Sequence, residues 1–177
     1  MAETPQEGEQ TSLVSPSFRI ATSNDIALIE YLDSFSSSPK RNIHQELEKY
    51  FGSVDPSTHE RTVIFLAERG PEVIAKAELM LPPQETSGDI GYIRRVIVHP
   101  DRRRQGLAHQ LIQYLITYAR DELHLAALYL HVWEENRSAI RLYEALGFHL
   151  QHRELYMTLT LDPDIYPPDT SASTSVL

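Results

Sequence analysis

The chain has 177 residues, of which 41% are hydrophobic and 23% charged, so it can bury a core and wholesale disorder is excluded. It contains no cysteine, which excludes a disulfide scaffold, a thiol nucleophile and a thiolate metal site. Its net charge is −9, but six of the 25 acidic residues lie in segments 1–17 and 162–177, which leaves 19 acidic against 16 basic residues between them. A nearly balanced body argues against general nucleic-acid binding.

The two ends of the chain differ from its middle in composition. Residues 1–17 and 162–177 are rich in Pro, Ser, Thr, Glu and Asp, so we expect two flexible tails, the first of them acidic. Residues 18–161 are expected to form one folded domain. No stretch is apolar for long enough to cross a membrane and the N-terminus lacks a signal-peptide pattern. We therefore expect no membrane association and a cytoplasmic protein, with access to the nucleus left open.

Between the tails the hydrophobic period changes repeatedly, which predicts an α/β fold of mixed helices and strands. No internal repeat is visible. In chain order the pattern predicts a strand at 18–21, a helix from 22, a short helix near 43–51, a hairpin of strands 62–68 and 73–81, a strand at 92–98, a helix at 104–123, a strand at 128–132, a helix at 136–146 and a final strand at 148–161.

The first predicted helix has a capping-box pattern at its start. Thr22 is a candidate N-cap, and Asp25 follows three residues later. Ile26, Ile29 and Leu32 then recur on one helical face. We expect that face to be buried.

The most informative segment joins the strand at 92–98 to the long helix. Residues 101–108 read DRRRQGLA and enter the helix directly. A first helical turn offers unpaired N–H groups and partial positive charge to an anion. Gly106 has no side chain to hold a phosphate away from the backbone, and Arg103 and Arg104 can add ionic contacts. The alternative is a solvated turn or a fragment of a nuclear-import signal.

This segment resembles the acetyl-CoA signature R/Q-x-x-G-x-G/A of the GCN5-related N-acetyltransferase (GNAT) family, with Arg103, Gly106 and Ala108 at the defined positions. A second block, LYLHVWEENRSAIRLYEALGF from Leu128 to Phe148, resembles the family's strand, asparagine, short helix, tyrosine and Gly-Phe ending. The resemblance covers about residues 18–161. It implies a GNAT-type fold, in which about four helices flank a mixed, mostly antiparallel twisted sheet with a splayed strand pair.

The resemblance also implies acetyl-CoA as co-substrate and assigns its contacts. The backbone of Val96, Ile97 and Val98 would pair with the pantetheine arm, and an N–H near Val98 would hold the thioester oxyanion. Asn136 would lie beside the pantetheine where the strands splay. The pyrophosphate would be held by Arg103, Arg104, Gln105, Gly106, Leu107 and Ala108. Ala139 and Tyr143 complete the expected cofactor-binding set.

For catalysis, Tyr143 matches the family's general acid, which protonates the departing CoA thiolate; the alternative is a half-buried packing residue. Many members have a Glu base on the strand before the pyrophosphate turn, but here the region from Tyr92 to Val96 reads YIRRV and holds no carboxylate. His131 is the leading substitute, because some protein N-terminal acetyltransferases of the family have a catalytic histidine in a similar Leu-His-Val context. Glu78 is the second candidate, and for both the alternative is a structural polar residue.

Eight histidines raise the question of a metal site, but none shows H-x-x-x-H or H-E-x-x-H spacing, so we expect no metal. Arg94 and Arg95 could contact an acidic acceptor; the alternative is that they face solvent and neighbouring acids. Trp133 and Tyr92 are candidates for lining an acceptor slot; the alternative for these aromatic residues is the core. The loops expected to shape that slot are 36–41, 82–89 and 151–154.

The sequence therefore predicts an N-acetyltransferase that transfers acetyl from acetyl-CoA directly to a primary amine, of a small molecule or of a protein or peptide, in a ternary complex. The missing strand carboxylate keeps open an alternative, a non-catalytic acyl-CoA-binding sensor or scaffold. The expected partners are acetyl-CoA and the amine acceptor, with no nucleic acid and no membrane. A homodimer is left open.

Overall fold

The computed structural model describes residues 15–36, 41–51, 54–55, 57–83 and 89–155, together with residues 157, 159 and 161. The chain up to Gly147 forms one compact unit, and the chain from Phe148 onwards forms a second. The two predicted tails lie almost wholly outside the described residues. Within the described part, no helix is both long and apolar enough to cross a bilayer.

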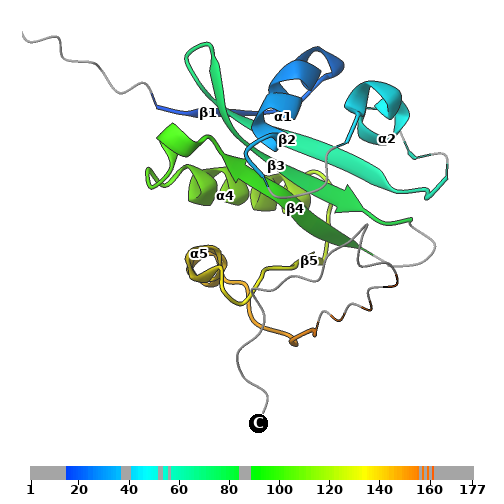
Figure 1. Cartoon of the computed structure of the whole chain (residues 1–177), viewed down its shortest axis with the longest axis vertical. Coiled ribbons are helices and arrows are strands. Elements are labelled where there is room, and N and C mark those ends of the chain that lie inside the picture. The colour runs from blue at the N-terminus through cyan, green and yellow to red at the C-terminus, as the bar shows by residue number, and fades with distance from the viewer. Residues whose placement is uncertain are drawn as a thin grey trace, which may run out of the picture. The chain divides into compact units, whose positions relative to one another are not determined.

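The described part of the first unit holds five strands and four α-helices (Figure 1). Short 3-10 helices at Ser23–Asp25, Ile43–Gln45 and Pro100–Arg102 precede α1, α2 and α4. In chain order the main elements are β1 (Ser17–Ile20), α1 (Ile26–Asp33), α2 (Leu47–Phe51), β2 (Arg61–Arg69), β3 (Glu72–Leu81), β4 (Ile90–Val98), α4 (Leu107–Asp121), β5 (Ala127–Leu130) and α5 (Arg137–Ala145).

The strands form one mixed sheet in the order β1-β2-β3-β4-β5. The pairs from β1 to β4 are antiparallel, and β5 alone runs parallel to its neighbour β4. The predicted hairpin is confirmed as β2 and β3, whose turn contains Gly70 at a φ of +60°. The predicted mixed, mostly antiparallel sheet is thus confirmed.

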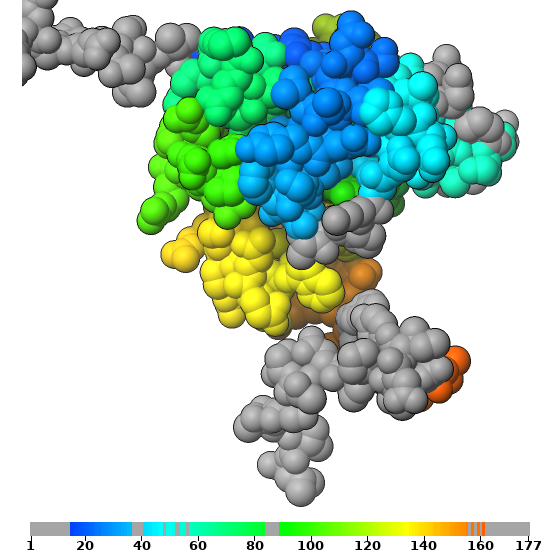
Figure 2. All heavy atoms as spheres, turned by 45° about the horizontal axis from the view of Figure 1, so that its top comes forward, coloured from blue at the N-terminus to red at the C-terminus, as the bar shows by residue number. Residues whose placement is uncertain are grey.

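Helices cover both faces of the sheet. On one face the ring of Phe65 in β2 packs against Tyr118 of α4, with 5.3 Å between the ring centroids. On the other face Ile64 of β2 joins the core cluster that contains Ile29 of α1. Figure 2 shows α1 (blue) and α2 (cyan) side by side at the surface. The alternation of side chains along a strand therefore decides which residues meet α4 and which meet α1.

Strand β4 departs from regular pairing on both of its edges. Against β3, Glu78 pairs with Arg94 but Lys76 pairs with Ile97, so two residues of β4 stand opposite Ala77. This is a β-bulge, and Arg95 within it has a left-handed φ of +48°. Against β5, pairing ends at Ile93 and Leu130, whereas β4 continues to Val98. The predicted splayed strand pair is therefore present.

The predicted capping box is confirmed. The amide of Asn24 donates to Thr22 Oγ1 at 3.3 Å, and the amide of Thr22 donates to Asp25 Oδ2 at 2.8 Å. Arg19 of β1 donates to both carboxylate oxygens of Asp25, at 2.8 and 2.7 Å. The hydrogen bond from Arg19 lowers the pKa of Asp25 to about 2. The cap thus also joins β1 to α1, whose Ile26, Ile29 and Leu32 are buried as expected.

The final strand predicted at 148–161 is wrong for the described residues, because 148–155 adopt no strand. The alternating apolar residues Leu155, Met157 and Leu159 have exposed fractions of 90, 86 and 82%. A strand needs a neighbour to satisfy its backbone groups, and the described residues of the second unit contain no strand. Alternation of apolar residues therefore indicated a capacity for strand formation that residues 148–155 do not use.

Replacing Asp25 by Asn tests the contribution of the cap. We expect the free energy of unfolding at pH 7 to fall by about 1–2 kcal/mol, because Asn keeps the shape but not the charge that Arg19 contacts. Folding lowers the pKa of Asp25 from 3.8 to about 2. The charge of Asp25 therefore stabilises the fold fully at a pH above 3.8, and this stabilisation is lost as the pH falls through about 2. In urea unfolding from pH 7 to pH 2, the two proteins should converge at the acid end. Glu144→Gln, at an exposed acid of α5, is the control, and a pH-independent difference would contradict the assignment.

Candidate functional site

The turn between β4 and α4 exposes backbone amides at the start of a long helix. Residues 103–106 are exposed, α4 begins at Leu107, and the first hydrogen bond of the helix runs from Gln110 N to Gly106 O at 3.1 Å. The amides of the preceding residues therefore have no carbonyl within the helix to bind. Because the helix dipole adds partial positive charge at this end, the turn can hold an anion.

Gly106 leaves space in front of those amides. Its φ of +74° and the φ of +60° at Arg104 give the turn two left-handed residues. A Cβ at position 106 would meet only Gln110 Nε2, 3.7 Å away, so no packing contact requires glycine here. The positive φ favours glycine, and the missing side chain keeps the backbone accessible. The predicted run 103–108 therefore fits a diphosphate group.

Two side chains of the β2–β3 hairpin hold this turn, and the sequence analysis did not identify them. Arg69 Nη1 donates to Gln105 Oε1 at 2.9 Å, and Arg102 Nη2 donates to Glu72 Oε2 at 2.7 Å. Both partners lie more than 25 residues upstream of the turn, so no local pattern predicts the contacts. They tie the anion-binding turn to the sheet.

The backbone of Val98 faces the gap between β4 and β5. The amide of His99 donates to Ile74 O on β3 at 2.9 Å. Because pairs with and without hydrogen bonds alternate in an antiparallel ladder, the preceding residue, Val98, directs its N–H and C=O away from β3. Val98 O indeed accepts from Arg103 Nε at 3.2 Å. The Val98 N–H is thus directed to the open edge of β4, beside the turn.

His99 connects this edge to α1, which sequence reasoning also missed. Its Nε2 lies 3.1 Å from the hydroxyl of Tyr31, and its Nδ1 accepts from the amide of Asp101 at 3.3 Å. The ring also packs edge-on against Phe35, with 4.9 Å between centroids. Helix α1 is therefore attached to the residue that begins the turn.

Helix α5 carries the predicted asparagine and tyrosine. Asn136 is its N-cap: Oδ1 accepts from Ala139 N at 3.2 Å and from Ser138 Oγ at 3.1 Å. Tyr143 lies further along α5 and is partly buried. Burial raises the pKa of its phenol, because burial disfavours the phenolate. Tyr143 is therefore protonated at neutral pH.

Glu78, the second candidate base, is fully buried on β3. Its Oε1 lies 2.5 Å from Lys76 Nζ, and its Oε2 accepts from Arg41 Nη1 at 3.0 Å. Burial acts to raise the pKa of Glu78, but Lys76 and Arg41 outweigh it and the pKa is lowered. A carboxylate held charged between two cations is a weak proton acceptor.

His131, the first candidate base, directly follows the last residue of β5. It is exposed and lies one residue beyond Leu130, where pairing with β4 ends. The strand predicted at 128–132 is thus shorter than expected, and His131 stands just outside it at the splay. Its role in catalysis stays a prediction.

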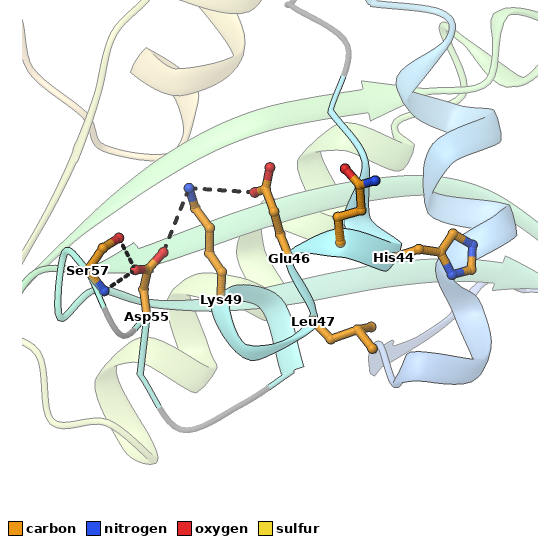
Figure 3. A pocket seen from close by; sticks show the side chains of 7 residues that line it. His44, Glu46, Leu47, Lys49, Asp55 and Ser57 are labelled. Atoms are coloured by element: carbon orange, nitrogen blue, oxygen red, sulfur yellow. Dashed lines mark hydrogen bonds and ion pairs between the residues drawn. The ribbon is translucent and has the colours of Figure 1, made fainter.

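An open hollow of about 500 Å³ lies beside α2 (Figure 3). In it, Lys49 Nζ lies 3.7 Å from Glu46 Oε2 and 3.9 Å from Asp55 Oδ2, and Ser57 Oγ donates to Asp55 at 2.6 Å. These charges are paired with one another. No residue predicted to bind coenzyme or to act as acid or base lines the hollow, so we do not identify it with the candidate site.

Other predicted features are placed only in part. The predicted acceptor loops at 36–41 and 82–89 lie largely outside the described residues, and the loop at 151–154 belongs to the second unit. Among the side chains that the structure describes, no three His, Asp or Glu residues are close enough to share a metal ion.

Comparison with known proteins agrees with this geometry. The family model described as "Acetyltransferase (GNAT) family" matches residues 25–148. N-alpha-acetyltransferase 60 of Xenopus tropicalis is 31% identical over 131 residues, which cover 70% of this chain and 51% of that protein. Glucosamine 6-phosphate N-acetyltransferase of Trypanosoma brucei brucei is 28% identical over 100 residues, which cover 55% of this chain and 65% of that protein. The matches thus span less than two thirds of these relatives.

Solved structures share the fold. The ribosomal-protein-S18-alanine N-acetyltransferase from Escherichia coli aligns with a TM-score of 0.62 at 20% identity, over 78% of this chain and 80% of that chain. AAC(6')-Iy, solved in complex with the bisubstrate analog CoA-S-monomethyl-acetylneamine, aligns with a TM-score of 0.65 at 16% identity, over 82% of this chain and 99% of that chain. At these identities the structures support the fold alone. Together with the family model, which spans most of the chain, they show that this chain belongs to the GNAT acetyltransferase family.

Proposed function

We propose that this protein binds acetyl-CoA and transfers the acetyl group directly to a primary amine, with both substrates bound at once. One observation carries the proposal: the open backbone edge at Val98 adjoins the exposed amides that start α4. An extended arm with amide groups fits the first feature, and a diphosphate fits the second. Coenzyme A contains both groups in one molecule.

The coenzyme would lie along β4 and end at α4. The amides of residues 104–108, with Arg103 and Arg104, would hold the diphosphate, and Gly106 would give it access. The backbone of Val96, Ile97 and Val98 would pair with the pantetheine arm, with Asn136 and Ala139 of α5 on its other side. Acetyl-CoA supplies an activated acyl group, and the protein supplies its orientation relative to the amine.

Two groups of the protein would act on the reacting atoms. The Val98 N–H, which faces the gap, would stabilise the negative charge that forms on the acyl oxygen. Tyr143, whose phenol burial keeps protonated, would donate a proton to the departing thiolate. No covalent acetyl-enzyme is required, and the chain has no cysteine to form one.

We assign the general base to His131 rather than to Glu78. The electrostatics favour this choice, because the two cations beside Glu78 lower its pKa. His131 is exposed and stands at the end of the β5 edge, next to the splay. Relatives are named for acetylation of a sugar phosphate amine, of spermidine and of an alanine of a ribosomal protein, so the acceptor panel should include these three classes.

The first test is thiol release from acetyl-CoA over that panel, together with the affinity for CoA. Gly106→Trp should fill the space before the helix amides and raise the Kd for CoA at least about tenfold, or about 1.4 kcal/mol of binding free energy. Isothermal titration calorimetry measures this change.

Gly70→Trp is the matched control, because Gly70 also has a positive φ and open space around its Cβ position. Unchanged CoA affinity in folded Gly106→Trp would refute the diphosphate site. Tight binding of CoA without turnover of any amine would instead favour a non-catalytic acyl-CoA sensor or scaffold.

Tyr143→Phe removes the phenolic proton and keeps the ring. We expect kcat to fall roughly 100-fold, the lower range for loss of a general acid, with the Kd for CoA unchanged. Steady-state kinetics and calorimetry separate the two effects. Tyr118→Phe, on α4, is the control for loss of a tyrosine hydroxyl, and a normal kcat in Tyr143→Phe would limit Tyr143 to packing.

His131→Ala tests the base by its pH profile. A base must lose its proton before it can accept one, so the rate of the wild type should fall at acid pH. The variant should lose this acidic limb and be slower at neutral pH. His44→Ala, at an exposed histidine near α2, controls for removal of a histidine. An acidic limb of the same shape in His131→Ala would assign it to another group.

A further inference from the structure

Six charged side chains gather on the sheet face that α1 covers. Two of them come from β3, two from β4, one from α1 and one from the segment after α1. Contacts of 4 Å or less join them. They are Asp33, Arg41, Lys76, Glu78, Arg94 and Arg95. Among these six residues, four are cations and two are carboxylates, so positive charge exceeds negative charge by two.

The four inner residues neutralise one another. Lys76 Nζ lies 2.6 Å from Asp33 Oδ1 and 2.5 Å from Glu78 Oε1. Arg41 Nε donates to Asp33 Oδ2 at 2.9 Å, and the same guanidinium contacts Glu78 and stacks 4.5 Å above the ring of Tyr50. Two cations thus fully engage two carboxylates in a buried site.

The two arginines of β4 lie at the edge of this group. Arg94 Nε lies 3.8 Å from Glu78 Oε2 and forms no hydrogen bond in the described part of the structure, and Arg95 Nη1 lies 3.9 Å from Asp33 Oδ1. The Arg94 side chain keeps 35% of its surface exposed, against 7% for Arg41. Its Nη2 donates to Thr62 Oγ1 at 3.0 Å, so the guanidinium extends from β4 across β3 toward β2.

Arg94 lies at the point where β4 and β5 separate. It follows Ile93, the last residue of β4 that pairs with β5. It shares its face of β4 with Tyr92, whose ring lies 5.7 Å from that of Tyr129 on β5. Helix α4 packs on the opposite face of the sheet, so Arg94 lies on the face of β4 that α4 leaves uncovered.

We propose that the acceptor carries an anionic group beside its amine, and that Arg94 binds this group and so determines acceptor specificity. This inference rests on the proposed transfer reaction. The positive charge of Arg94 repels a cationic amine, whereas an anion attached to that amine offsets the repulsion. The planar guanidinium matches the geometry of a carboxylate or a phosphate, which can accept two hydrogen bonds from it.

The same charge helps the chemistry. An amine attacks only in its neutral form, and nearby positive charge lowers the pKa of an ammonium group. The arginines of β4 would therefore favour loss of the proton that the base removes. The site combines recognition of an anion with activation of the amine next to it.

The test uses two matched pairs of amines and the full chain. One pair is a hexosamine 6-phosphate and the same hexosamine without phosphate; the other is a tripeptide with Asp after its first residue and its Asn counterpart. The pairs distinguish a phosphate from a carboxylate as the anion. Binding of each amine to the CoA-saturated protein is measured by calorimetry, and thiol release is measured in parallel.

Three variants are compared with the wild type. Arg94→Met keeps the length of the side chain and removes its charge, Arg94→Lys keeps the charge and loses the planar fork, and Arg120→Met removes an exposed charge from the far helix α4. We expect the wild type to prefer the anionic member of one pair by about tenfold or more. Arg94→Met should lose that preference, Arg94→Lys should keep part of it, and Arg120→Met should keep all of it. CoA affinity should be the same throughout.

Equal binding of both members of both pairs by the wild type would overturn the inference, and so would a preference that survives in Arg94→Met. The same experiment tests the proposed acetyl transfer independently of this inference. Preferential binding of an anionic amine that depends on Arg94, without release of thiol, would support the acceptor site and refute the transfer.

Discussion

The bulge in β4 is the feature on which the candidate site depends. A regular β4 could pair with β5 along its whole length, and the backbone edge at Val98 would then be closed. Instead, two residues of β4 oppose Ala77, and the pairing with β5 stops at Ile93. Bulges bend a strand and increase its twist, which separates it from a parallel neighbour. The left-handed Arg95 costs on the order of 1–3 kcal/mol, and the surrounding packing must offset this strain.

The buried charges next to the bulge make its surroundings rigid. Lys76 and Glu78 are fully buried on β3, so each would be strongly destabilising without an opposite charge. Asp33 and Arg41 supply those charges from α1 and the segment after it. The helix is thus fixed to the sheet by directional ion pairs as well as by the apolar contacts of Ile29 and Leu32. The same pairing lowers the pKa of Glu78 and so weakens it as a proton acceptor, which supports the proposed assignment of the base to His131.

How far the sequence predicted this structure depends on the range of each interaction. The capping box of Thr22 and Asp25 and the glycine at the start of α4 are local patterns, and both were predicted. Asp33 contacts Lys76, Arg41 contacts Glu78 and Arg69 contacts Gln105. Each of these partners lies more than 30 residues away, and no local pattern predicts such contacts. Lys76 and Glu78, two charged residues with the spacing of one strand face, interrupt an apolar run; the sequence analysis considered Glu78 as a base but did not use this pattern to predict a buried ion pair. The strand predicted at 148–161 failed for the reverse reason, since alternation does not supply a pairing partner.

The residues of β4 before the turn bear on where the proposed base can stand. This strand holds Tyr92 and, two residues on, Arg94 on the same face, and residues 92–96 include no carboxylate. A carboxylate at position 92 would stand near that guanidinium, which would lower its pKa and weaken it as a base. The proposed acceptor site at Arg94 therefore fits better with a base on another element. His131, the proposed base, satisfies this condition, because it follows the end of β5 on the far side of the gap from the buried ion pairs.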